Sequence, residues 1–183
     1  MRGLIFILLL GTSLISFGQI DWSDGKLKWS DFYGPVPSNS KFDALTHSTI
    51  SLDFEGQNII LNFTIKSQFN PDKSWKKEGV DAYILKHEQI HFDITEYHAR
   101  LLRKNLKSYK YKSFATIAPD IQRMFDEASQ KANEMQIRYD EETNHSINRK
   151  KQAKWNKKIQ KLLNKTSSYK KATFKVSIAY VTS

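Results

Sequence analysis

The spacing of the apolar residues changes once along this chain, and that change limits the fold more than any other feature. Between residues 49 and 66, apolar and polar side chains alternate on both sides of Glu55-Gly56-Gln57, which can make the turn of a hairpin. From residue 81 onwards, the apolar residues recur mostly every third or fourth position. Period two is typical of half-buried strands, and a period near 3.6 is typical of amphipathic helices. The sequence therefore predicts an α+β fold in which a small antiparallel sheet precedes a set of helices.

Three helices and a last strand are expected after this hairpin. The predicted elements are helices over residues 81–106, 119–139 and 147–163 and a strand over residues 174–180. Asp81 is a suitable N-cap for the first helix, because its carboxylate can accept from the free backbone N–H groups. Pro119 is expected in the first turn of the second helix, where proline is tolerated. The segment 139–145 is expected to be a polar loop between the second and third helices.

Residues 1–18 predict a cleavable signal peptide. Arg2 provides the positive start, a short apolar run follows, and the small residues Ser16 and Gly18 precede the expected cut. The run is too short for a comfortable membrane span, although an uncleaved anchor is the alternative. We therefore expect residues 19–183 to form a single secreted or periplasmic domain without a stable membrane span.

Composition limits the chemistry of this chain. It has 183 residues, no cysteine and a formal net charge of +10. Any transition metal must therefore be held by His, Asp or Glu. Ten basic residues and no acid lie between Arg149 and Lys171. An anionic partner is one interpretation, but a solvated helix face is favoured. No specific nucleic-acid partner is expected, and binding to DNA or anionic vesicles should be weak and fall with salt.

The chemical motif of the chain is His-Glu-Gln-Ile-His at residues 87–91. On a helix, positions i and i+4 share one face, so His87 and His91 can bind one metal ion together. Glu88 points about 100° round the axis and can reach a water on the metal without binding the metal itself. This pattern predicts a catalytic Zn²⁺ site with Glu88 as the general base. Two unconnected histidines on a surface helix are the alternative.

A catalytic zinc ion requires a third protein ligand. His98 shares the helix face of His87 but lies about 10 Å beyond His91 along the axis, too far to bind the same ion. If the second helix runs back antiparallel to the first, the segment 139–145 emerges beside the metal. We predict His145 as the third ligand, with Asp140, Glu141 and Glu142 as alternatives. On this prediction, zinc affinity collapses in His145→Ala and survives in His98→Ala.

Several segments together resemble a known bacterial family. They are Trp29–Gly34, the hairpin, Leu85–Ile94, Tyr139–His145, and Gln152 with Trp155. The chain resembles the exported proteins described as secreted zinc-dependent proteases, domain of unknown function 922. The resemblance spans nearly the whole mature chain and implies a zincin-like peptidase. Ser146 stands where the family pattern has glycine after the loop histidine.

These observations lead to one functional hypothesis and one rival. The hypothesis is a secreted zinc-dependent metallopeptidase that hydrolyses peptide or related amide bonds in a peptide or protein substrate. The rival is a non-catalytic exported protein that contains zinc or uses its basic helix to bind an anionic envelope or nucleic-acid partner. Zinc content and the effect of Glu88→Gln separate the two.

Overall fold

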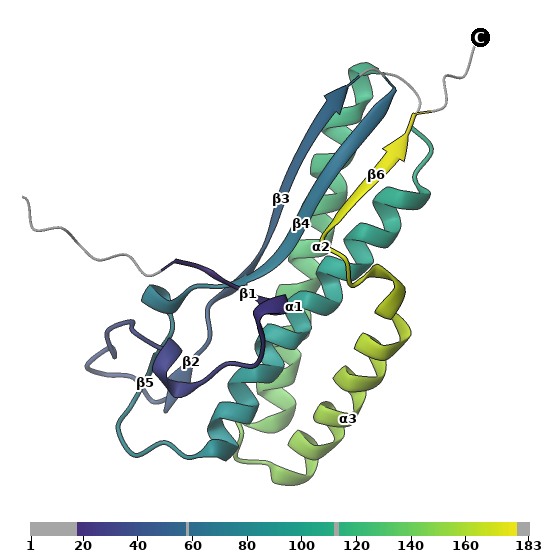
Figure 1. The fold of residues 1–183 in the computed structure, drawn as a ribbon. Helices are drawn as coiled ribbons and strands as arrows, with labels where there is room; N and C mark the ends of the chain where they lie inside the picture. The colour runs from purple at the N-terminus through teal and green to yellow at the C-terminus, as the bar shows by residue number, and fades with distance from the viewer. Residues whose placement is uncertain (1–17, 58, 112–113, 179–183) are drawn as a thin grey trace, which may run out of the picture.

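A long β-hairpin lies against two antiparallel helices, and a third helix packs beside the first (Figure 1). The structure, a computed structural model, describes residues 18–57, 59–111 and 114–178. Its strands are β1 (Ile20–Asp21), β2 (Ala44–Leu45), β3 (Ser48–Gln57), β4 (Ile60–Phe69), β5 (Trp75–Lys76) and β6 (Thr173–Ser177). Its α-helices are α1 (Ala82–Ser108), α2 (Phe114–Thr143) and α3 (Arg149–Lys165). The predicted α+β class, a small antiparallel sheet followed by helices, is confirmed.

The main sheet is antiparallel throughout the described residues. Strand β4 pairs with β3 along its whole length and also with β1 and β6, while β2 and β5 form a separate two-stranded sheet. The register brings Gln57 opposite Ile60, so Glu55, Gly56 and Gln57 all lie within β3 and do not form the turn. The prediction of the turn was wrong because the backbone hydrogen bonds between β3 and β4 outweigh the local turn preference of Gly56.

The inner face of the sheet packs on α1 and α2. Leu61, Phe63 and Ile65 of β4 are buried, as the alternation predicts. They belong to one core cluster with Leu102 of α1 and Ile121 of α2. This core holds α1 and α2 side by side and therefore sets the level at which the end of α2 meets the start of α1.

The boundaries of α1 and α3 lie within two residues of the predictions, whereas those of α2 differ by four or five residues. Asp81 caps α1 as expected, since its Oδ1 accepts from the backbone N–H groups of Tyr83 and Ile84 at 3.0 Å each. Helix α2, however, begins five residues before Pro119 and continues to Thr143. Packing of Ile117 in the core stabilises this extra first turn despite the proline. Asp140 therefore lies in the last turn of a helix and not in a loop.

A second core lies between α1 and α3. Trp155 and Ile159 of α3 pack against Ile90 and Ile94 of α1, and Tyr139 of α2 lies in the same cluster. Deeper along α1, the Glu96 carboxylate accepts from Arg100 Nε at 2.7 Å and from an Arg103 terminal nitrogen at 3.0 Å. All three side chains are buried, so the middle of α1 contains a buried ion-pair network.

Two predictions concern the ends of the chain. The predicted signal peptide lies outside the described residues except for Gly18. Strand β6 confirms a last strand, while the predicted end of that strand at residues 179–180 is also outside them. Among the described helices, none combines the length and apolar character needed to cross a bilayer.

Candidate metal centre

The two histidines of the motif meet on one face of α1, near its start. Their Nε2 atoms are 3.3 Å apart, and both side chains are buried. The helix produces this pairing directly, because residues four apart lie one turn above one another. Both nitrogens face the end of α2. The predicted juxtaposition of His87 and His91 is confirmed.

Asp140 completes a three-atom group with this pair. Its Oδ1 lies 3.1 Å from Nε2 of His87 and 3.1 Å from Nε2 of His91. With zinc–ligand bonds of about 2.0–2.1 Å, two corners of a coordination tetrahedron lie about 3.3–3.4 Å apart. The three observed separations are close to that edge length. His87, His91 and Asp140 therefore form a group of suitable size and chemistry for a metal ion.

Two glutamines hold the imidazole rings in place. His87 Nδ1 lies 2.8 Å from Gln152 Oε1 of α3, and His91 Nδ1 lies 3.1 Å from Gln136 Oε1 of α2. An amide oxygen only accepts, so each Nδ1 carries a proton, and with a metal ion bound each Nε2 would offer its lone pair to that ion. Such partners fix the orientation of metal-binding histidines. The sequence reasoning missed both roles, although Gln152 is a polar residue within an otherwise apolar helix face.

Tyr139 lies beneath the His87 ring and is fully buried. Its ring stacks on that imidazole with centroids 4.6 Å apart, and its hydroxyl donates to the backbone carbonyl of His87 at 3.3 Å. Gln152 Nε2 donates to the same hydroxyl oxygen. Tyr139 is thus part of the core, as its place in the apolar stripe of α2 predicts. Its ring stacking and its hydrogen bond to the backbone help to hold His87 in position.

The charges of the site favour an ionised carboxylate. Burial by itself would raise the pKa of Asp140, but hydrogen bonds from His87 and His91 outweigh burial and hold this pKa well below its usual range. Burial likewise disfavours the charged form of His91, yet Asp140 and Glu88 outweigh it and raise the pKa of His91. Asp140 is therefore a carboxylate at neutral pH, the form that binds metal ions.

Glu88 points into the same cavity as the histidine pair. Only 4% of the residue is exposed, and its Oε2 is buried with no hydrogen-bond partner among the described residues. A buried carboxylate oxygen without a partner is costly, and functional sites are the usual place for one. This buried carboxylate belongs to the wall of the cavity that His87 and His91 also line.

His145 and His98 lie in different surroundings. His145 Nδ1 is 3.8 Å from Asp140 Oδ1, and the ring packs against Phe42 with centroids 4.5 Å apart. His145 therefore lies beside the three-atom group, whose carboxylate comes from Asp140, one of the predicted alternatives. His98 is buried further along α1, with an Nε2 that has no partner among the described residues.

A strained turn places His145 at the site. Asn144, His145 and Ser146 all have positive φ angles, of 47°, 49° and 76°. This is the left-handed conformation that glycine adopts most easily. Three such residues in succession turn the chain sharply from α2 toward α3. Residues other than glycine rarely adopt this backbone conformation, and such backbone strain is concentrated at functional sites.

The candidate metal centre opens into a cavity of about 790 Å³. It is lined by residues 41–48, which lead into β3, by the start of α1 and by the last turns of α2. Glu88, His91 and His145 all line it. The centre is therefore accessible to a ligand of small-molecule or peptide size.

The comparison with protein families matches residues 31–146 to a family described as "Bacterial protein of unknown function (DUF922)". The matched range covers well over half of the chain and contains every residue of the centre that α1 and α2 contribute. The chain belongs to the DUF922 family. Searches of curated proteins and of solved structures found no significant match. Membership in DUF922 thus confirms the resemblance at the level of the family and leaves its activity open.

The DUF922 match ends at Ser146, before α3. Gln152, which orients His87, therefore lies outside the matched range. The matched range contains His87, Glu88, His91 and Asp140 of this chain, whereas the polar partner of His87 comes from α3.

Proposed function

We propose that this DUF922 protein is a secreted or periplasmic zinc-dependent peptidase with a zincin-like active site. The supporting observation is the group formed by His87, His91 and Asp140, whose ligand atoms lie within 4.8 Å of one another. Two neutral imidazoles and one carboxylate are a donor set that zinc uses in catalytic sites. Asp140 takes the third position in this proposal. The assignment of His145 as the third zinc ligand stays a prediction, which mutation can test.

Donor type favours zinc over the hard cations. Mg²⁺ and Ca²⁺ prefer sites made entirely of oxygen, whereas imidazole suits zinc and its neighbours in the transition series. When bound, zinc would supply a Lewis acid that activates water and polarises a carbonyl group. Glu88 has a free, buried carboxylate oxygen in the same cavity.

Different residues of the chain have different roles in the proposed hydrolysis. Glu88 accepts a proton from the attacking water and then delivers it to the leaving amine nitrogen. Gln152 and Gln136 keep both imidazoles in the tautomer that presents Nε2. The cavity walls, including the segment 41–48, hold the substrate against the centre. A peptide is the proposed substrate class because an extended chain can lie along this open cavity.

The decisive experiment compares residues 19–183 with the variants Glu88→Gln and Glu141→Gln. Glu141→Gln is the matched control, since it removes an exposed carboxylate near the same site. Zinc content is measured by elemental analysis, and hydrolysis is measured on labelled casein and a quenched-fluorescent peptide library. We expect about one zinc per chain in all three proteins, and a rate about 10²–10⁴-fold lower in Glu88→Gln alone.

Three results would contradict this proposal in different ways. If the wild type holds almost no zinc after reconstitution, the metal centre is refuted. If Glu88→Gln loses its zinc, Glu88 is a ligand and not the base. If all three proteins hold zinc and none cleaves any substrate, the chain is the non-catalytic zinc-containing protein of the rival hypothesis.

A further inference from the structure

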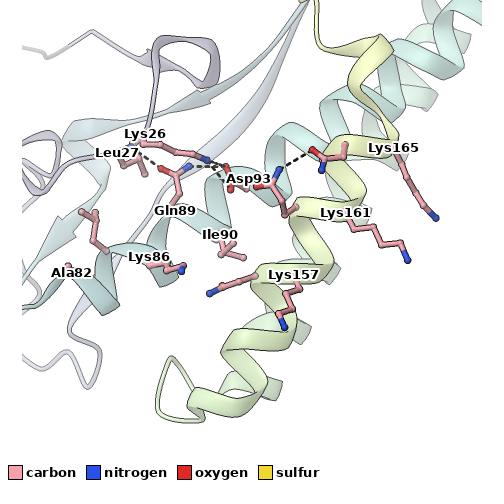
Figure 2. A pocket seen from close by; sticks show the side chains of 14 residues that line it. Lys26, Leu27, Ala82, Lys86, Gln89, Ile90, Asp93, Lys157, Lys161 and Lys165 are labelled. Atoms are coloured by element: carbon pink, nitrogen blue, oxygen red, sulfur yellow. Dashed lines mark hydrogen bonds and ion pairs between the residues drawn. The ribbon is translucent and has the colours of Figure 1, made fainter.

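A second, larger cavity lies between α1 and α3, with a volume of about 1060 Å³ (Figure 2). The residues of α1 that line it include Leu85, Gln89 and Asp93, whereas His87 and His91 line the metal cavity. At about 100° per residue, these two sets lie on opposite sides of the helix. The second cavity is therefore separate from the metal centre and requires its own explanation.

Five lysines are among the residues that line this cavity. They are Lys26, Lys86, Lys157, Lys161 and Lys165. The three lysines of α3 follow one another along the helix, as Figure 2 shows, and are spaced four residues apart. Like charges at this spacing destabilise a helix. An arrangement that costs stability and lines a cavity points to an anionic ligand.

Asp93 is the one acidic side chain among the described residues that line the cavity, and its charge is already compensated. Asp93 Oδ1 accepts from Trp22 Nε1 at 2.7 Å, from Gln89 Nε2 at 2.9 Å and from Lys26 Nζ at 3.2 Å. The remaining four lysines make no ion pair within the part of the chain that the structure describes. The cavity thus keeps a strong excess of positive charge.

The floor of the cavity is apolar and held in place. Leu27 and Ile90 are buried there, and Ala82 and Leu85 extend the apolar surface toward the start of α1. The Leu27 backbone N–H donates to Gln89 Oε1 at 2.8 Å, which ties the N-terminal segment to α1. No aromatic side chain lines this cavity among the described residues. Stacking of nucleic-acid bases, which uses aromatic platforms, is therefore not supported.

We propose that this cavity binds a single-chain amphiphilic anion, with its apolar chain on the floor and its phosphate or carboxylate group among the lysines. An apolar surface with a few convergent polar groups and this volume is typical of small-molecule sites. A simple solvated lysine face does not explain the fixed apolar floor beneath the charges. This proposal is independent of the metal centre and of hydrolysis.

The test is calorimetric titration of residues 19–183 with dodecyl phosphate below its micelle-forming concentration. Two variants change the site: Lys157→Gln/Lys161→Gln removes rim charge, and Ala82→Trp fills the exposed end of the floor. Lys150→Gln/Lys154→Gln is the matched control, because these exposed lysines lie on α3 outside the cavity. Circular dichroism checks that each variant is folded.

We expect one dodecyl phosphate per chain, bound about tenfold more weakly by each site variant and unchanged by the control pair. Binding should also weaken as salt screens the lysines. The proposal is overturned if dodecyl maltoside binds equally well, since only apolar contact would then matter. Equal affinity for inorganic phosphate or a deoxythymidine oligomer would overturn it too, by showing a non-specific basic surface. The proposal is also refuted if the protein binds anionic phospholipid vesicles but not dodecyl phosphate. It is refuted as well if the site variants bind dodecyl phosphate as tightly as the wild type.

Discussion

Replacement of Asp140 by alanine tests the metal centre most directly. The change removes the atom that lies 3.1 Å from both imidazole nitrogens and leaves the two histidines in place. Without metal, the change removes two hydrogen bonds from buried imidazoles, a cost that is partly offset because the helix dipole opposes a carboxylate in the last turn. Comparing each protein with and without zinc therefore separates zinc binding from folding.

The expected size follows from binding linkage. Free zinc at about a thousand times its dissociation constant stabilises the folded wild type by about 4.1 kcal/mol. Altering a partner of a ligand costs roughly 10–100-fold in metal affinity, so loss of the ligand itself should cost about 100-fold or more. The same zinc concentration then stabilises Asp140→Ala by at most about 1.4 kcal/mol. For a domain of this size, 1 kcal/mol corresponds to about 2–4 °C in Tm.

The assay is thermal unfolding by circular dichroism with and without zinc, together with competition against a chelator. We expect zinc to raise Tm by about 8–16 °C in the wild type and by no more than about 3–6 °C in Asp140→Ala. Glu141→Ala, one residue along the same helix, is the control and should behave like the wild type. An unchanged zinc response in Asp140→Ala would refute the assignment of the third ligand.

The other predictions concern single residues around this centre. Zinc affinity should fall about 10–100-fold in His145→Ala, as for a neighbour of the ligands, and stay unchanged in His98→Ala; a collapse in His145→Ala with a mild effect of Asp140→Ala would restore His145 as the third ligand. Burial lowers the pKa of His98 to about 4, below its ordinary value of 6.5. The unfolded chain therefore binds more protons between these values, and stability should fall by up to about 3 kcal/mol from pH 6.5 to pH 4; denaturant titrations should show a smaller loss in His98→Gln, and an equal loss would exclude His98 as the cause. Glu96→Gln should cost about 3–5 kcal/mol in urea unfolding, because two buried arginines lose their counter-ion; a cost below about 1 kcal/mol would contradict this account. Ser146→Gly should raise the free energy of unfolding by about 1 kcal/mol, because glycine adopts the φ of 76° without strain. An unchanged free energy of unfolding would show that this conformation of Ser146 is not strained.

The local parts of the fold were predictable from the sequence. Alternation marked β3 and β4, and the 3.6 period with Asp81 marked α1 within two residues of its ends. The pairing of His87 with His91 followed from helix geometry alone. These features depend on residues a few positions apart, whose relative placement the backbone of one element determines.

The rest depended on how the elements pack. Helix α2 starts before Pro119 and runs through Asp140 because core contacts outweigh local preference. The third member of the metal group depends on the register between α1 and α2, and a shift of one residue would present another side chain. The sequence could narrow that choice to the segment 139–145 but could not select Asp140 from it.

The supporting groups and the second cavity also required the tertiary structure. Gln152 meets His87 across 65 positions of sequence, and the lysine-lined cavity joins the N-terminal segment, α1 and α3. The sequence determined the kinds of chemistry available, which are imidazole, carboxylate and an excess of lysine without thiols. Only packing decided which of these side chains share a site, because distances between separate elements are set by how their side chains fit together.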